Sequence, residues 1–172
     1  MWFGGASALA LPHYDFGFKV DGSRTFLELA SGVAAPSLVA LALGFSVWSS
    51  DIGALGPWQV KASARASFGP DSTVLDRLHT PTLDLLRPAS WTLYQKFDVI
   101  FMAQGAEGGG QLGSVPMCNG FRQAIRAFLK PDGVALFVAN RRVLNSSYEC
   151  IRSDSLHFVA LHHQELLWMN TG

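Results

Sequence analysis

Residues 25–51 constrain the fold more than any other part of the chain. Residues 25–29 and 45–49 are short apolar runs that predict strands. Between them, Pro36 suits the first turn of a helix, where its missing N–H costs nothing, and Gly44 suits the left-handed end of that helix. The succession of strand, tight turn, helix and strand is typical of the unit that binds nucleotide-like cofactors.

The remainder of the chain continues this alternation. Residues 97–102, FDVIFM, form a continuous apolar run of the kind found in a strand covered on both faces. We further expect helices at 59–66, 117–129 and 154–163, a short extended segment near 82–85, a glycine-rich loop at 105–114, a turn at 130–133, and strands at 134–139 and in ELLWM. Strands that alternate with helices predict an α/β fold with a Rossmann-like, mostly parallel sheet and helices on both faces.

The length and charge of the chain set limits on its organisation. A chain of 172 residues, 49% of them hydrophobic, is long enough for one domain with a substantial core. We expect a single domain over 1–172, made of an N-terminal segment (1–24), a cofactor-binding core (25–142) and a C-terminal helix and strand (143–172). Its 13 basic and 13 acidic residues balance, so the charge gives no indication of a nucleic-acid partner.

The cysteines and apolar runs bear on the compartment. Cys118 and Cys150 are far apart and match no metal-ligand spacing, which favours reduced thiols in an intracellular protein, and we predict no metal site. The longest apolar run, 33–48, is shorter than the ~20 residues of a spanning helix, so no membrane span is expected. The apolar start of the chain has no basic residues before it, which argues against a secretory signal. Cytoplasmic and organellar (mitochondrial) locations both stay open.

Gly32 and Asp51 carry the strongest chemical signal. Gly32 lies in the turn after the first expected strand, and Asp51 follows the second, 19 residues further on. An acid about 20 residues after a glycine turn is placed to accept both hydroxyls of a ribose, in a dinucleotide or in S-adenosylmethionine. The dinucleotide pattern G-x-G-x-x-G is absent, because the same frame reads ASGVAA from Ala30, and a pyrophosphate site is therefore disfavoured.

Several stretches resemble class I S-adenosylmethionine-dependent methyltransferases. LELASGVAAPSLVALALG resembles their motif I, often written LELGSGTGLPGLVAALLG, and FDVIF and FLKPDGVALFVANRR resemble the motifs of the fourth and fifth strands. Within that superfamily the chain looks closest to the lysine-methyltransferase-like branch, methyltransferase family 16. MWFGGASALA resembles the segment ahead of motif I in that branch, PTLDLL stands where it has a Leu-Asp-Trp cluster, and VANRR fits its fifth strand. The resemblance covers about Trp2 to Arg142.

This resemblance implies S-adenosylmethionine as the cofactor and gives six residues a role. Glu28, Ala30 and Gly32 are expected to line its methionine end, Asp51 to hold the ribose, Ile52 to flank the adenine ring and Asp84 to face the adenine amino group. The chemistry suits these roles, because a carboxylate accepts hydroxyl and amino hydrogens and a turn without side chains lets the backbone approach a ligand.

The chain departs from the family pattern in three places. Ala30 and Ala34 stand where the pattern has glycine; alanine is acceptable if φ is negative, although two methyl groups narrow the pocket. Residues 103–107, AQGAE, replace an Asp-x-x-Tyr stretch that holds the substrate in the lysine-modifying branch, so the acceptor is not fixed as lysine. About thirty residues remain after Val138, so one edge of the sheet is expected to be missing or supplied by a neighbour.

Methyl transfer asks the protein mainly to align the acceptor with the methyl group, so no nucleophile triad is expected. If a base is needed, Glu107 is the candidate, with Gln104 as a positioning amide. Two functions stay open: an active methyltransferase acting on a protein or small-molecule acceptor, and a catalytically inactive methyltransferase-like subunit of a larger complex. The expected partner is accordingly a protein substrate or a protein complex.

Overall fold

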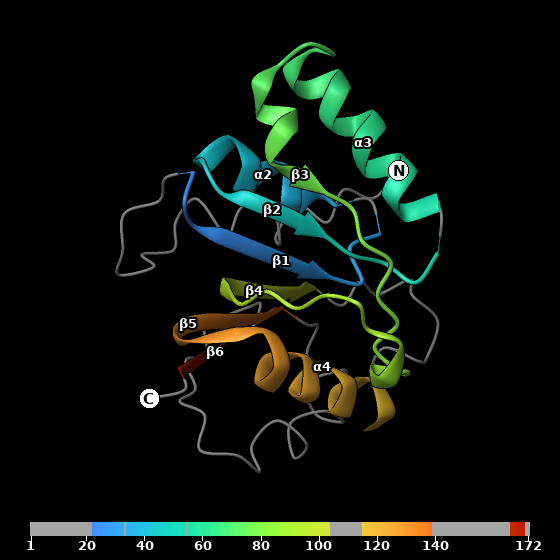
Figure 1. Ribbon diagram of the computed structural model, residues 1–172, viewed down its shortest axis with the longest axis vertical. Helices are drawn as coiled ribbons and strands as arrows, with labels where there is room; N and C mark the ends of the chain where they lie inside the picture. Colours follow the sequence, from blue (N-terminus) through green and yellow to red (C-terminus); the bar gives the residue numbers. More distant parts are fainter. Residues whose placement is uncertain (1–21, 33, 54, 104–114, 139–165, 171–172) are drawn as a thin grey trace. The chain divides into compact units, whose positions relative to one another are not determined.

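The computed structural model describes residues 22–32, 34–53, 55–103, 115–138 and 166–170 (Figure 1). The chain divides into two compact units, Met1–Leu83 and Asp84–Gly172, which are taken in turn. The single domain expected from the sequence stays a prediction. Most of the N-terminal segment, the glycine-rich loop with Gln104 and Glu107, and the expected helix at 154–163 lie outside the described residues.

In the described part of the first unit, three strands pair in parallel. Its elements are β1 (Thr25–Leu29), α2 (Ala35–Leu43), β2 (Ser46–Ser49), α3 (Leu55–Phe68), the 3-10 helix η2 (Thr73–Arg77) and β3 (Leu78–His79). β2 pairs with β1 on one side and with β3 on the other. These elements confirm the predicted strand, helix and strand of residues 25–49, and α3 extends beyond its predicted bounds at both ends.

Apolar side chains bury most of β1 and part of β2. Phe26, Leu27 and Leu29 of β1 and Val47 of β2 are fully buried. The ring of Phe26 lies 5.7 Å from that of Phe45, measured between centroids. Because successive side chains of a strand point to opposite faces and residues 26–29 are all buried, both faces of β1 are covered, as is typical of parallel sheets.

Helix α2 begins and ends as its sequence predicts. Pro36 lies in the first turn, and Gly44 follows the helix with a φ of 108°, a left-handed conformation that glycine adopts without a steric penalty. Arg77 of η2 also stabilises this end. Its guanidinium donates hydrogen bonds to the carbonyl oxygens of Leu41 at 3.2 Å and Phe45 at 3.0 Å. A cation is favourable there because the last carbonyls of a helix carry partial negative charge.

The expected extended segment near 82–85 is confirmed only at Thr82, and the edge strand lies earlier in the chain. The edge strand is β3, where His79 lies beside Trp48 of β2 and the two rings stack with centroids 4.2 Å apart. Thr82 forms an isolated bridge with Asp51, and the chain then turns at Asp84. The turn explains the error, because Leu83 is buried like a strand residue although the backbone does not continue as a ladder.

In the described part of the second unit, two strands pair in parallel and a third joins them antiparallel. Its elements are the 3-10 helix η3 (Pro88–Ser90), β4 (Phe97–Ala103), α4 (Val115–Phe128), β5 (Leu129–Val138) and β6 (Leu166–Asn170). β5 pairs with β4 in parallel and with β6 antiparallel. Residues 97–102 are all buried, and Phe121, Ile125 and Phe128 form the buried face of α4, as predicted.

The predicted turn at residues 130–133 is instead an irregularity inside β5. Leu129 pairs with Phe97, whereas the next pair joins Val134 to Val99, so the chain of β5 bulges between these positions. The residues that suggested a turn, Pro131 and Gly133, are those that a bulge accommodates. The bulge carries Lys130, whose ammonium lies 2.8 Å from the carboxylate of Asp98.

The described strand pairings agree with the predicted mostly parallel α/β fold, since β1–β2, β2–β3 and β4–β5 are parallel and β5–β6 is antiparallel. The strand expected in ELLWM is confirmed as β6. None of the helices in the described ranges is long and apolar enough to cross a membrane.

Candidate cofactor site

The carboxylate of Asp51 faces the turn that follows β1. Its Oδ2 accepts a hydrogen bond from the backbone N–H of Gly32 at 2.8 Å. Its Oδ1 accepts from the N–H of Ile52 at 2.7 Å and from that of Gly53 at 3.4 Å. The acid and the turn predicted from their spacing of 19 residues are therefore in direct contact.

Backbone hydrogen bonds hold the turn against the end of β2. The N–H of Ser31 donates to the carbonyl of Ser50, and the N–H of Ser50 donates to the carbonyl of Glu28, both at 2.9 Å. Helix α3 begins close to the same acid, because a Cβ added at Gly56 would lie 2.8 Å from the Cβ of Asp51. The position of Asp51 is thus fixed from the strand, the turn and the helix together.

Both alanines of the turn have the left-handed conformation. The φ angles of Ala30 and Ala34 are 51° and 55°, beside 52° at Gly32. The expectation that alanine is harmless here required a negative φ, so that condition is not met. A left-handed L-residue costs about 1–2 kcal/mol because its Cβ approaches the following carbonyl oxygen. The turn keeps the backbone path that glycine would favour, although two of its residues carry a methyl group.

Replacing Ala30 by glycine should raise the free energy of unfolding by about 0.5–1 kcal/mol, because the relieved strain exceeds the roughly 0.4–1 kcal/mol that glycine adds to the freedom of the unfolded chain. Ala34→Gly should change stability little, since it also removes a fully buried methyl group worth about 0.8 kcal/mol. Urea unfolding measures both.

Ala42→Gly is the matched control, because Ala42 is an exposed residue of α2 and lacks a positive φ. That change should lower the free energy of unfolding by about 1 kcal/mol. A similar loss in Ala30→Gly would mean that the turn is not strained.

Glu28 is buried and serves the start of α2. Its Oε2 accepts hydrogen bonds from the backbone N–H and from the hydroxyl of Ser37, in the first turn of the helix. Ala34 stands at the N-cap and has no side chain to accept from this turn, so a carboxylate from β1 takes that function. Burial raises the pKa of Glu28 to about 8, against the opposing effect of the two Ser37 hydrogen bonds.

In the structure, Glu28 has a structural role that the sequence did not predict. The sequence placed Glu28 at the methionine end of a cofactor, whereas one of its carboxylate oxygens bonds the helix. Ser37 was missed by the sequence analysis. The sequence feature that could have indicated Ser37 is a hydroxyl residue directly after Pro36, in a helix whose N-cap is alanine.

Two buried hydroxyls near the turn lack a partner within the described residues. Ser31 is 8% exposed and Ser49 is 1% exposed, and neither Oγ makes a hydrogen bond there. Ser49 pairs across the strands with Glu28, and Ser31 lies in the turn itself. A buried hydroxyl without a partner costs free energy, so an orphan hydroxyl in the turn is a place where a polar ligand atom gains a hydrogen bond.

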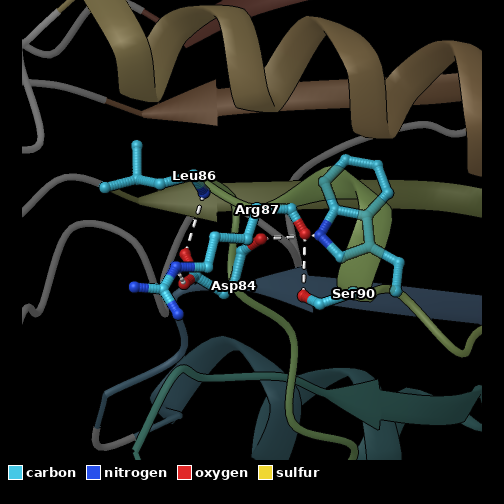
Figure 2. A network of polar contacts seen from close by, with 5 residues as sticks. Asp84, Leu86, Arg87 and Ser90 are labelled. Atoms are coloured by element: carbon cyan, nitrogen blue, oxygen red, sulfur yellow. Dashed lines mark hydrogen bonds and ion pairs between the residues drawn. The ribbon is translucent and has the colours of Figure 1, made fainter.

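Asp84, the predicted adenine residue, belongs to the second unit and makes local contacts (Figure 2). Its Oδ1 accepts from the N–H of Leu86 at 2.9 Å, and its Oδ2 lies 3.6 Å from the Nε of Arg87. Its backbone carbonyl accepts from the indole N–H of Trp91 at 2.6 Å. The side chain therefore orders the turn into η3, and the contact with adenine stays a prediction.

The other predicted residues divide into two groups. Ile52 lies next to Asp51 with 63% of its surface exposed, which leaves it accessible to a ligand beside that acid. Gln104 and Glu107 lie outside the described residues, so their catalytic roles stay predictions.

No protein-family model and no curated protein sequence matches the chain, whereas solved structures do. The glycopeptide N-methyltransferase MtfA complexed with (S)-adenosyl-L-methionine matches with a TM-score of 0.56 and 20% identity, over 78% of this chain and 49% of its own. The ribosomal protein L11 methylase from Lactobacillus delbrueckii subsp. bulgaricus matches with a TM-score of 0.60 and 17% identity, over 85% and 68%. The CcbJ methyltransferase from Streptomyces caelestis has a TM-score of 0.56 and 20% identity, over 80% and 55%.

These matches define the fold class. The chain has the Rossmann-like, mostly parallel α/β fold of class I S-adenosylmethionine-dependent methyltransferases, as the sequence predicted. The chain spans about half the length of the glycopeptide N-methyltransferase. At this level of identity the similarity concerns the fold, and the activity has to be argued from the site.

Proposed function

We propose that this chain is an S-adenosylmethionine-dependent methyltransferase that acts on a protein or small-molecule acceptor. The observation that carries the proposal is the contact of 2.8 Å between the Asp51 carboxylate and the Gly32 N–H. The carboxylate, which can accept hydroxyl hydrogens, lies against a turn that leaves space for a ligand, since a Cβ added at Gly32 would meet no atom within 4 Å. The fold shared with solved methyltransferases supports this reading.

The residues of the turn fit the adenosine sugar with one adjustment. A carboxylate offers about four acceptor positions, and three N–H groups already point at Asp51. One ribose hydroxyl can therefore bind directly. The second takes the place of the Gly53 N–H, whose bond of 3.4 Å is the weakest of the three. The unpartnered hydroxyl of Ser31 offers a further hydrogen bond to a polar group of the cofactor.

The bound cofactor would supply a methyl group already activated by its sulfonium. The protein then has to bind the cofactor, orient the acceptor and exclude water. Asp51 would fix the sugar, and the strained turn would bring the backbone of Gly32 close to the ligand. Ile52 would cover the adenine ring with its exposed side chain.

The acceptor is proposed at the level of its class. The resemblance to the lysine-methyltransferase-like branch favours a protein, and a protein substrate is the proposed partner. The sequence AQGAE in place of an Asp-x-x-Tyr stretch argues against assuming lysine itself. The alternative of a catalytically inactive subunit of a larger complex finds no support among the solved structures, and the experiment below decides against it or for it.

Calorimetric titration with S-adenosylmethionine and S-adenosylhomocysteine tests the proposal. We expect micromolar dissociation constants in the unaltered protein and a loss of at least about 100-fold in Asp51→Ala, because each hydrogen bond to a charged group contributes about 1.5–3 kcal/mol. Asp71→Ala is the control, since Asp71 is an exposed acid of the same unit. Circular dichroism verifies that the variants fold.

Two further outcomes are informative. Asp51→Asn keeps one acceptor oxygen and should fall between the unaltered protein and Asp51→Ala. No heat at millimolar cofactor from the folded protein would contradict a methyltransferase and favour the inactive subunit.

A further inference from the structure

A pocket of about 260 Å³ lies in the first unit, between α3, η2 and β3. Lys61 and Arg65 of α3 line one wall, and Pro70, Leu75 and Leu78 line the other. The pocket is separate from the cofactor turn along α3. Arg65 is nine residues beyond Gly56, which meets Asp51, and nine residues of helix span about 13 Å.

Among the residues that the structure describes, no acidic side chain pairs with the basic wall of the pocket. Lys61 and Arg65 are exposed and stand one turn apart on α3, where like charges repel. Neither side chain forms an ion pair or a hydrogen bond within the described residues. Asp71 and Asp76 flank the opposite wall in sequence, but both are exposed and neither pairs with these cations. An anion between Lys61 and Arg65 would relieve their repulsion.

The opposite wall provides apolar surface. Leu75 and Leu78 are each partly buried, so part of each side chain faces the pocket. The volume is slightly below the roughly 300–1,000 Å³ of pockets for drug-sized ligands. The pocket thus suits a group of the size of one amino acid, with its charge on the α3 side and its apolar part against the leucines.

We propose that this pocket binds a carboxylate carried on a compact apolar body, either in a small acyl amino acid or in the last residue of a protein chain. Lys61 and Arg65 would each donate hydrogen bonds to the carboxylate, and the guanidinium can do so with two parallel N–H groups. Leu75 and Leu78 would cover the apolar body. This site lies outside the proposed methyl-transfer site and does not depend on it.

N-acetyl-L-leucine is the probe, and N-acetyl-L-leucinamide is its uncharged match. In titrations of the ¹⁵N-labelled chain followed by NMR, we expect the acid to shift the backbone amides around the pocket with a millimolar dissociation constant. The amide should bind at least about 10-fold more weakly, since it cannot form the charge-assisted bonds. A peptide with the same C-terminal leucine, N-acetyl-Gly-Gly-Leu, distinguishes the two sources, because tighter binding than that of N-acetyl-L-leucine indicates the end of a protein chain.

The double variant Lys61→Gln with Arg65→Gln should weaken binding of the acid by at least about 10-fold, because glutamine keeps two methylene groups of each side chain but removes its positive charge. Arg126→Gln, at an exposed position of α4, should leave it unchanged. Equal binding of acid and amide, an unaltered affinity in the double variant, or an equal affinity for inorganic phosphate alone would each overturn the proposal. Both substitutions are at exposed positions, so a folded variant is expected, and its NMR spectrum verifies this.

Discussion

Glu28→Gln should remove a steep pH dependence from the stability of this protein. The pKa of Glu28 is about 8 in the folded chain and 4.5 as its ordinary value. At a pH between 4.5 and about 8, the Glu28 carboxyl has lost its proton in the unfolded chain but keeps it in the folded chain. The free energy of unfolding should therefore fall by about 1.4 kcal/mol per pH unit, in total by roughly 4–5 kcal/mol, as pH rises from about 4.5 to about 8.

The sign follows from which form is buried. A raised pKa in an acid means that folding favours the neutral form, so the stabilisation is fully present below pH 4.5 and is lost as pH rises through 8. Glutamine is neutral at every pH and keeps a carbonyl oxygen that can accept from Ser37. The variant should thus match the unaltered protein at low pH and exceed it in stability at pH 8 and above.

Urea unfolding at a series of pH values from 4 to 9 measures the difference between the two proteins. Asp71→Asn, at an exposed acid, serves as the control and should leave the pH profile in place. Parallel profiles for the unaltered protein and Glu28→Gln would show that Glu28 is ionised in the folded protein at neutral pH.

Lys130→Met should lower the free energy of unfolding by about 3 kcal/mol, the lower end of the cost of breaking a buried ion pair from one side. Asp98 is 2% exposed, and its carboxylate lies 2.8 Å from the Lys130 ammonium. Methionine fills similar space without a charge, so Asp98 would remain buried without this partner. The side chain of Lys130 is 33% exposed, which is why the lower end of the range is expected.

A double-mutant cycle with Asp98→Asn measures the coupling energy between Lys130 and Asp98 apart from their other contacts. The double variant should be more stable than the sum of the two single effects predicts, by at least about 1 kcal/mol, because each single variant keeps one charge of the pair and the double variant keeps neither. Denaturant unfolding of the four proteins gives this coupling. If Lys130→Met stays within about 0.5 kcal/mol of the unaltered protein, the ion pair is solvated and contributes little to stability.

Much of the fold follows from local sequence patterns. The apolar run at 97–102 and the spacing of Phe121, Ile125 and Phe128 predicted β4 and α4, because periodicity within a dozen residues determines which faces of an element can be buried. Pro36 and Gly44 fixed the ends of α2 for the same reason. The edge strand at Leu78–His79 and the bulge of β5 could not be predicted, because both depend on a neighbouring strand.

The sequence likewise predicted one part of the candidate site and not another. The distance of 19 residues between Gly32 and Asp51 predicted their contact, since a strand, a turn and a helix of ordinary lengths bring these positions to the same end of two parallel strands. The sequence did not show that Ala30 and Ala34 have a positive φ. Alanine rarely adopts that conformation on its own, so the surrounding structure imposes it.

The sequence by itself determined the order of the strands and helices other than β3, the two ends of α2 and the pairing of a glycine turn with an acid. Only the tertiary structure decided which partners the buried and partly buried polar groups have: Ser37 for Glu28, Lys130 for Asp98, and the end of α2 for Arg77. The physical reason is that turns and periodic faces depend on neighbouring residues, whereas a buried charge or hydroxyl takes whichever partner the folded chain brings near once water is excluded.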